Sequence, residues 1–156
     1  MKIRRDFVTN SSSSSFILGF KSENDIQETL AQEERIYEYF DVVFEDCQEA
    51  EKMTMDEMLK VAREEMEWNV RFDIEYYSEK GKSMKWDERY EWTKTREFEE
   101  MVESEIQKRL NEMKKKAEED GDEVFVKVQY SDDLYGELEH YLVPTFKCCL
   151  RRFNHH

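Results

Sequence analysis

The sequence predicts an α+β protein with a single domain over residues 1–156, built on a small, mostly antiparallel sheet that two to three helices cover on one face. Strand-like segments lie at both ends of the chain, and helical periodicity dominates between them. Only four glycines and one proline interrupt the chain, so its elements should be long. Ten Phe, eight Tyr and three Trp indicate a folded core although 40% of the residues are charged, because disordered chains are poor in aromatic residues.

The first third of the chain holds one predicted strand and two predicted helices. The apolar run Ser15–Phe20 is short and uninterrupted, which is typical of a buried strand. A helix should begin at residue 24 or 25, where either side chain can cap it, and end near residue 40. Thr54 and Glu57 have the spacing of a capping box, which predicts a second helix that ends at about Trp68.

Residues 70–92 predict a β-hairpin. Apolar and charged side chains alternate along Val70–Tyr77, as in a half-buried strand. Gly81 would supply the turn, and Met84–Trp92 continues the alternation in a returning strand, interrupted at Glu88.

The last part of the chain returns from helix to strand. The longest predicted helix covers about Lys94–Glu119, where apolar residues recur at helical spacing. A turn at residues 120–122 then leads to a strand at Val124–Val128. A short helical turn is expected around Leu134–Leu142, and Phe146–Phe153 predicts a final strand.

The net charge of −14 is distributed unevenly. Residues 1–21 and residues 141–156 each carry +3, so residues 22–140 carry −20. An acidic body repels phosphate backbones and anionic lipids, so we expect neither direct nucleic acid binding nor membrane binding. It would attract a basic protein surface. The alternative is a charged exterior that only keeps the protein soluble.

The cysteine content indicates a reduced, cytoplasmic protein. Cys47, Cys148 and Cys149 are odd in number, and neighbouring cysteines form only a strained disulfide. The basic start lacks the hydrophobic stretch of a secretory signal, and no segment approaches the length of a membrane span.

Five consecutive serines near the amino terminus are the most unusual feature of the chain: Ser11, Ser12, Ser13, Ser14 and Ser15. Val8 and Phe16 bracket them closely, so we expect the tract within the folded body and not in a linker. Together with Arg4 and Arg5, the hydroxyls could bind an anion or accept a phosphoryl group. The alternative is local hydrogen bonding that stabilises a turn.

All three histidines lie in the last 17 residues, and imidazole is the commonest transition-metal ligand. A divalent transition metal could therefore be held by His140, His155, His156 and Asp132, with Glu139 as a neighbouring carboxylate. The spacings of common metal motifs are absent, so the alternative is a polar tail without a ligand.

A serine-dependent reaction is a further hypothesis. Pairing of the strand at Ser15–Phe20 with the strand at Phe146–Phe153 would bring hydroxyls and imidazoles together, and Asp132 or Asp133 could orient the base. However, the Gly-x-Ser-x-Gly pattern of a nucleophile elbow is missing, and five serines single out no nucleophile.

The two ends of the chain carry a family resemblance. Residues 4–17, RRDFVTNSSSSSFI, resemble the opening of a group of small uncharacterised bacterial and bacteriophage proteins, which start with a basic stretch followed by Phe-Val-Ser/Thr-Asn, a serine run and Phe. Gly136–His140 and the closing Asn154–His156 are similar to endings in that group. The resemblance implies an association with phage or mobile elements, and it implies no activity.

These observations predict an acidic, non-enzymatic binding protein that recognises a basic protein surface, for example a nucleic-acid-binding site that the acidic body imitates. The rival hypothesis is a small metal-dependent or serine-dependent enzyme. It would use the serine tract with Asp132, His140, and His155 or His156.

Overall fold

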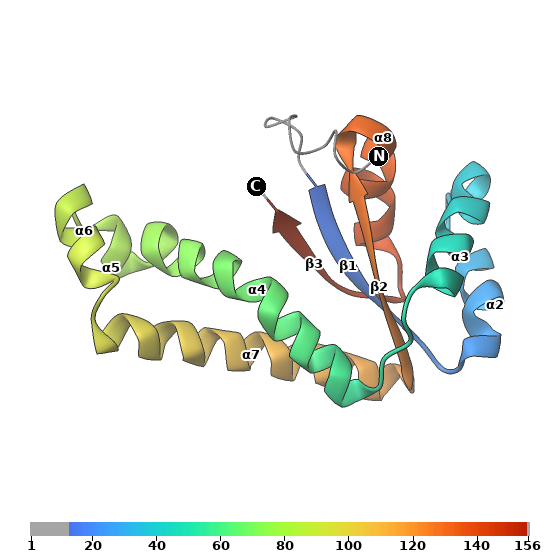
Figure 1. The fold of residues 1–156 in the computed structure, drawn as a ribbon, viewed down its shortest axis with the longest axis horizontal. Coiled ribbons are helices and arrows are strands. Elements are labelled where there is room, and N and C mark those ends of the chain that lie inside the picture. The colour runs from blue at the N-terminus through green and yellow to red at the C-terminus, as the bar shows by residue number, and fades with distance from the viewer. Residues whose placement is uncertain (1–12, 156) are drawn as a thin grey trace.

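The computed structural model describes residues 13–155, which form an α+β fold around a three-stranded antiparallel sheet (Figure 1). The strand order is β2-β1-β3, and the strands are β1 (Ser13–Phe20), β2 (Val124–Ser131) and β3 (Cys149–His155). Ser13 lies opposite Ser131 on one side and opposite His155 on the other. The first strand in the chain is therefore the central strand, and both of its neighbours come from the last third of the sequence.

β1 is buried on both faces, which confirms the buried strand predicted at Ser15–Phe20. Phe16 and Leu18 belong to the core on one face of the sheet, and Ile17 belongs to the core on the other. The expectation that helices cover only one face is therefore wrong. A central strand without a polar face needs cover on both sides, as helices provide in sheets that are buried on both faces.

Short helices cover the face that contains Phe16. They surround a core that includes Leu30, Val43 and Leu138. These elements are η1 (Glu23–Asp25), α2 (Ile26–Ala31), η2 (Tyr37–Tyr39), α3 (Phe40–Glu49), α8 (Asp132–Glu137), the π-helical turn η3 (Leu138–Leu142) and η4 (Val143–Thr145).

The single helix predicted from residue 24 or 25 to residue 40 is wrong. α2 ends at Ala31, and the chain reverses through Arg35 and Tyr37, whose φ angles are 66° and 29°. α3 then begins as a separate helix at Phe40. Left-handed backbone at two residues interrupts the helix, and side-chain periodicity does not reveal such an interruption.

Two long helices, α4 (Met55–Tyr77) and α7 (Arg96–Asp120), cover the other face. They pack on each other and, near the sheet, on Ile17 and Phe125. The capping box at the start of α4 is confirmed, because Thr54 N–H donates to Glu57 Oε1 at 2.9 Å and Glu57 N–H donates to Thr54 Oγ1 at 3.2 Å. α7 confirms the helix predicted over 94–119 to within two residues.

α4 and α7 continue side by side beyond the sheet, and α5 (Glu79–Lys82) and α6 (Trp86–Trp92) join them at the far end (Figure 1). We call residues 55–120 the arm. The β-hairpin predicted over residues 70–92 is wrong, because residues 70–77 belong to α4. Met66 and Val70 lie on the buried face of α4 that α7 covers. Residues four positions apart share one face in a helix and also in a strand, so this spacing does not distinguish the two structures.

The remaining elements agree closely with the sequence. Gly121 has φ 74° and ends α7 at the predicted turn. β2 extends the predicted strand to Ser131, and the helical turn expected around 134–142 is present as α8 and η3. β3 begins at Cys149, three residues later than predicted. Among residues 13–155, no helix combines the length and apolar character needed to cross a bilayer.

Candidate functional site

The described part of the serine tract begins β1. Ser14 is 0% exposed and Ser15 is 1% exposed, so both belong to the folded body, as expected. Successive side chains of a strand point to opposite faces, and these two hydroxyls therefore enter two separate polar networks. Five of the predicted site residues lie outside the described residues: Arg4, Arg5, Ser11, Ser12 and His156.

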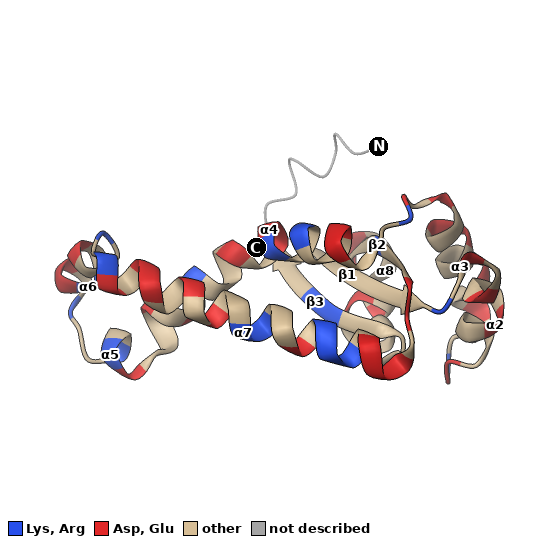
Figure 2. Ribbon diagram, turned by 90° about the horizontal axis from the view of Figure 1, so that it is seen from below, with Lys and Arg blue, Asp and Glu red and all other residues tan. Residues whose placement is uncertain are grey.

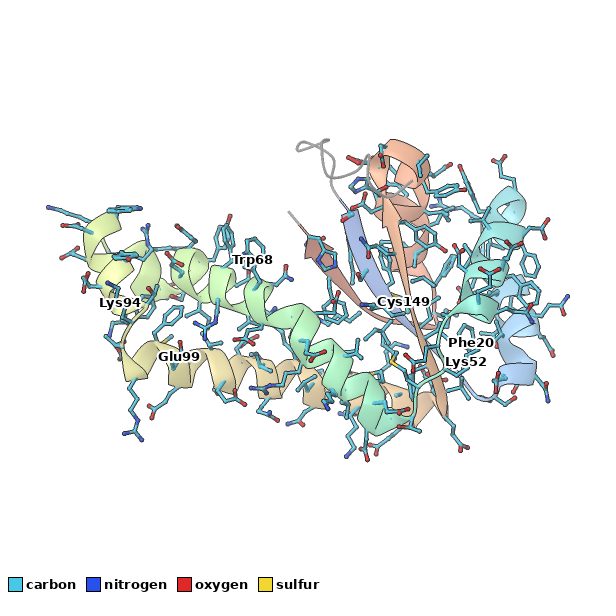
Figure 3. All side chains as sticks on the ribbon, viewed as in Figure 1. Phe20, Lys52, Trp68, Lys94, Glu99 and Cys149 are labelled. Atoms are coloured by element: carbon cyan, nitrogen blue, oxygen red, sulfur yellow. The ribbon has the colours of Figure 1, made fainter. Side chains whose placement is uncertain are left out.

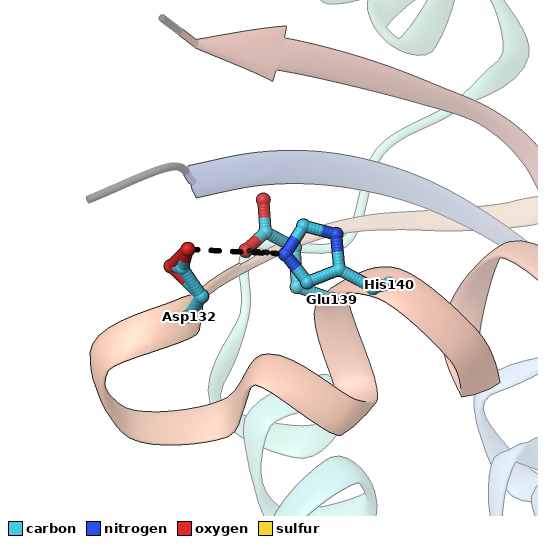
Figure 4. Close-up of side chains that lie close together, drawn as sticks. All are labelled: Asp132, Glu139 and His140. Carbon is cyan, nitrogen blue, oxygen red and sulfur yellow. Dashed lines mark ion pairs between the residues drawn. The ribbon is translucent and has the colours of Figure 1, made fainter. Parts of the chain in front are cut away.

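One network gathers Asp132, Glu139 and His140 between β1 and the α8–η3 segment (Figure 4). His140 Nε2 lies 3.3 Å from Glu139 Oε1 and 3.9 Å from Asp132 Oδ2. Glu139 is 0% exposed, whereas the other two side chains reach the surface. The predicted pairing of Asp132 with His140 is thus present in space, and Glu139 joins it.

The local backbone explains how these residues converge. α8 is kinked at Tyr135, which has φ −132° and ψ 53°, and the next turn, η3, is π-helical. A π-turn places one additional residue in a helical turn and changes the direction of the side chains that follow. Glu139 therefore points into the protein beneath the sheet while its neighbour His140 remains accessible.

Ser14 and Arg152 hold the buried carboxylate of Glu139. Ser14 Oγ donates to Glu139 Oε2 at 2.9 Å, and Arg152 Nε donates to Ser14 Oγ at 3.0 Å. An Arg152 terminal nitrogen lies 3.7 Å from Glu139 Oε2 and 3.4 Å from His140 Nδ1. A buried carboxylate is destabilising unless it is paired, and the guanidinium group supplies the compensating charge.

These contacts partly fit a metal site. One ligand atom from each of Asp132, Glu139 and His140 lies within 4.8 Å of the other two, and Ser14 orients Glu139 as an outer-shell residue would. Arg152 opposes this arrangement. Guanidinium groups only donate, so a hydrogen bond from Arg152 to His140 Nδ1 requires the tautomer with its proton on Nε2, toward the carboxylates. A metal on Nε2 would move that proton to Nδ1 and displace Arg152.

The second network lies on the opposite face of β1. Ser15 Oγ is 2.8 Å from His155 Nε2, and His155 Nε2 is 3.1 Å from Glu65 Oε1 on α4. Lys127 Nζ lies 3.5 Å from the other oxygen of Glu65. The close contact with the His155 imidazole, aided by the charge of Lys127, lowers the pKa of Glu65 to about 2 although burial opposes this shift. Among the described residues, no hydrogen bond with good geometry reaches Glu65 Oε1. This network ties α4 to all three strands.

The second network contains a serine, a histidine and a carboxylate, but not in a catalytic arrangement. In a catalytic triad the serine and the carboxylate contact different ring nitrogens, so that the ring can accept a proton on one side while the other is held. Here Ser15 and Glu65 both contact Nε2 of His155. Ser15 is also enclosed, so its hydroxyl does not face a substrate.

The site expected from the sequence is therefore divided. Asp132 and His140 lie with Ser14 on one face, and His155 lies with Ser15 on the other, so one catalytic set combining them is wrong for the described residues. Sequence reasoning missed Glu65 and Arg152. In β3 the side chains of Arg152 and Asn154 point to one face of the sheet and that of Phe153 points to the other. This alternation was the sequence signal that could have placed Arg152 beside Ser14.

The three cysteines are free thiols. Cys47 and Cys148 are buried in the core, in agreement with a role as small apolar residues. Burial raises the pKa of Cys47 and of Cys149 to about 12, and it also raises the pKa of Cys148. Thiols that remain protonated at neutral pH are poor nucleophiles.

Acidic residues around α2 and α3 have few basic neighbours, whereas red and blue segments mix along the arm (Figure 2). Residues 22–50, which we call the acidic lobe, contain ten acids and one base, a net charge of −9. Seven of the acids are exposed: Glu23, Glu28, Glu34, Glu38, Asp41, Glu45 and Glu49. Buried Glu33 is different, because its carboxylate accepts the backbone N–H groups of Lys147 and Cys148 and so fastens α2 beside the start of β3.

Within residues 13–155 the acids of the lobe have no salt-bridge partner, in contrast to those of the arm. No salt bridge found among residues 13–155 involves an acid of residues 22–50. On the arm, Arg71 pairs with Glu67 and Glu99, and Arg109 pairs with Asp73 and Glu105. The arm thus neutralises much of its own charge, and the lobe presents its charge to solvent.

A groove of about 360 Å³ borders the lobe and is lined by Arg35, Tyr37, Glu38, Tyr39, Glu137, Tyr141 and Leu142. Tyr39 Oη donates to Glu137 Oε1 at 2.7 Å across it. Tyr37 is 79% exposed, at the point where the backbone is left-handed.

Comparisons with known proteins match nothing: no family model, no curated protein and no solved structure is similar to this chain.

Proposed function

We propose that this chain is a non-enzymatic, cytoplasmic binding protein whose acidic lobe recognises a basic protein surface. The observation that carries the proposal is the set of exposed carboxylates of residues 22–50, none of which forms a salt bridge within residues 13–155. Unpaired carboxylates at one end of a molecule produce a directional field, which accelerates association with a positively charged partner.

The partner would present clustered lysine and arginine side chains. Such clusters commonly bind phosphate backbones, so an acidic lobe of this kind would compete with nucleic acid for its partner and would not itself bind nucleic acid. The resemblance at the two ends of the chain agrees with a phage or mobile-element protein that occupies such a site on a host protein.

The groove beside the lobe offers a second type of contact. Complementary charge increases the rate at which two proteins associate and orients them, whereas most of the binding free energy comes from a few buried anchor residues. Tyr37, Tyr141 and Leu142 provide apolar surface within reach of Glu38, so an apolar side chain in the partner's basic segment would fit here. Left-handed backbone at a non-glycine residue is an unfavourable conformation that clusters at binding loops, and Arg35 and Tyr37 have it.

The test compares two charge-reversed variants with the same net charge. The lobe variant carries Glu34→Lys, Glu38→Lys and Asp41→Lys, and the control carries Glu112→Lys, Glu118→Lys and Glu119→Lys on exposed positions of α7. Immobilised wild-type protein should capture a basic protein, binding should weaken as salt rises, and duplex DNA should displace it. The lobe variant should lose this partner and the control should keep it. Equal capture by both variants would contradict the proposal.

A second candidate function is a divalent transition-metal site at Asp132, Glu139 and His140, favoured by the 4.8 Å convergence of their ligand atoms. Metal analysis of untagged protein and a thermal shift with Zn²⁺ would test it. Binding should be lost in His140→Ala and kept in His155→Ala, whose imidazole belongs to the other network. Absence of stoichiometric binding, or equal loss in both variants, would remove this candidate.

A further inference from the structure

The arm carries aromatic side chains on the side opposite its core. Met66 and Val70 of α4 face α7, whereas Trp68, Phe72 and Tyr76 follow one another at intervals of four residues on an outer face. Figure 3 shows Trp68 projecting from α4 away from α7. Ring centroids are 5.3 Å apart between Trp68 and Phe72 and 4.8 Å apart between Phe72 and Tyr76, so the three rings form one continuous row.

α6 extends this row. Trp86 and Tyr90 stack with their ring centroids 5.9 Å apart, and Arg89 lies on the same side of the helix by spacing. The Arg89 guanidinium lies 4.9 Å from the centre of the Tyr76 ring and so joins the two groups. Trp68, Phe72, Tyr76, Trp86 and Tyr90 are hereafter the aromatic face.

The aromatic face is large for an unpartnered surface. Trp68 is 52% exposed and Trp86 is 71% exposed. With about 150–250 Å² for each aromatic side chain, the five residues expose on the order of 500 Å². This is a large fraction of the roughly 800 Å² that each partner buries in a standard interface, and Trp, Tyr, Phe and Arg are the residues enriched in interface cores.

Charge along the face changes sign from one end to the other. α4 carries seven acids and three bases, a net charge of −4. Residues 78–96, which we call the tip, carry six bases and four acids, a net charge of +2. Two tip cations contact rings of the aromatic face: the Arg89 guanidinium lies over Tyr76, and Lys94 Nζ, which also pairs with Glu91, is 4.2 Å from the centre of the Tyr90 ring.

We propose that the aromatic face is a dimer interface whose occupant is a second copy of this chain, packed antiparallel about a two-fold axis near Phe72. In this arrangement Trp68 of each copy lies against Tyr76 of the other, and each positive tip reaches the acidic α4 of its partner. A two-fold interface must be complementary to itself, and a face whose charge reverses along its length satisfies that condition only when the copies are antiparallel.

The geometry of α4 assigns one charge pair across the axis. Glu64 shares the helix face of Trp68 and lies about 12 Å from Phe72, at 1.5 Å per residue. Lys94 lies beyond Tyr76 on the other side of Phe72, over Tyr90. The two-fold axis therefore places Lys94 of one copy near Glu64 of the other. Glu64 is exposed and has no salt bridge among the described residues, so it is available for this contact.

The experiment measures mass and dimer dissociation by light scattering and sedimentation on the full chain. Wild-type protein should have twice the 19.1 kDa mass of one chain. Phe72→Ser should weaken the dimer about 30-fold or more, as for other central aromatic anchors. Leu134→Ser, an exposed apolar residue outside the arm, is the matched control and should leave the dimer unchanged. Circular dichroism verifies that each variant keeps its helix content.

Charge reversal tests the antiparallel arrangement. Glu64→Lys and Lys94→Glu should each weaken the dimer, and the double variant should restore it. A wild-type monomer at all concentrations, or a dimer that Phe72→Ser leaves intact, would overturn the proposal. Failure of the double variant to restore the dimer would overturn the two-fold arrangement. These outcomes do not depend on the acidic lobe, so the dimer proposal and the proposal of a basic partner are tested independently.

Discussion

Glu65 joins the arm to the sheet, and its pKa predicts how this junction responds to acid. The folded protein lowers the pKa of Glu65 from 4.5 to about 2, chiefly through the close contact with the His155 imidazole. The unfolded chain therefore binds a proton more readily, so the stabilisation is complete above about pH 4.5 and is lost as pH falls toward 2.

Glu65→Gln should consequently lower the free energy of unfolding at pH 7 by on the order of 2 kcal/mol. The difference from wild type should shrink as urea titrations are repeated from pH 6 to pH 3. Glu112→Gln, which changes an exposed glutamate of α7 outside this network, should have little effect at any pH. A constant difference across that range would show that the ionised form of Glu65 is not what stabilises the fold.

Asp122 has the opposite pH dependence. Its Oδ2 atom is buried against Gly19 with no hydrogen-bond partner in the described part of the chain, and burial raises the pKa of Asp122 from 3.8 to about 6. Between pH 3.8 and about pH 6, Asp122 is protonated in the folded protein and ionised in the unfolded chain. The stabilisation that this proton supplies is therefore lost as pH rises from 3.8 to about 6. Asp122→Asn should therefore raise the melting temperature at pH 7.5, and the gain should diminish at pH 5. An equal gain at both pH values would refute the charge explanation.

At the residue scale, the sequence indicated which chemistries were present but not how the residues are grouped. Asp132 and His140 converge as predicted because a short helical segment keeps them close in the chain. Glu65 was not predicted, because α4 brings it to β1 from fifty positions away in the sequence. Its position in the sequence did not distinguish it from the exposed glutamates of the same helix. The separation of Ser14 from Ser15 depends on strand register, which the serine run does not determine.

At the scale of elements, Gly81 shows how a glycine can be misinterpreted. It was expected in a hairpin turn, but it lies buried in α5, where an added Cβ would be 2.1 Å from the backbone oxygen of Glu75. Gly81→Ala should lower the free energy of unfolding by about 1–3 kcal/mol, because α5 must move away from the last turn of α4 to make room for the added methyl group. Gly136→Ala is the control, since its Cβ would meet only an ordinary contact at 3.5 Å. Similar urea midpoints for the two variants would contradict this expectation.

Elements with local end signals were predicted well. The capping box at Thr54 and the glycine after Asp120 fixed the start of α4 and the end of α7 to within two residues. The end of α4 was not predicted, because the buried Val70 and the outward Phe72 and Tyr76 together alternate with charged residues, and this pattern matches a strand equally well. The break between α2 and α3 depends on left-handed backbone at Arg35 and Tyr37, for which neither residue type gives a signal.

At the scale of the whole molecule, the sheet and the tip of the arm should differ in local stability. β1 is hydrogen-bonded on both edges and buried on both faces, whereas α5 and α6 are short and lie at the far end of the arm (Figure 1). Amide hydrogen exchange should be slowest in β1 and faster by orders of magnitude in α6. Equal protection in the two segments would show that the molecule opens only as a unit.

The α+β class followed from composition and from the position of strand patterns, and the structure confirms it. The shape of the molecule did not follow. A helix that extends beyond its sheet has the same inner periodicity as one that ends at the sheet edge, so the sequence gives no sign of an arm. The two-sided burial of β1 was implied by its uninterrupted apolar run, although a helix segment would have the same pattern.

The order of the strands has a consequence for synthesis on the ribosome. Ser13 pairs with Ser131 and with His155, so an apolar strand made early must wait for more than a hundred further residues before either neighbour exists. The α4–α7 pair needs only contacts nearby in the chain and should form while translation continues. We expect the nascent polypeptide to acquire its helical pair first and to depend on chaperones until the last strand emerges.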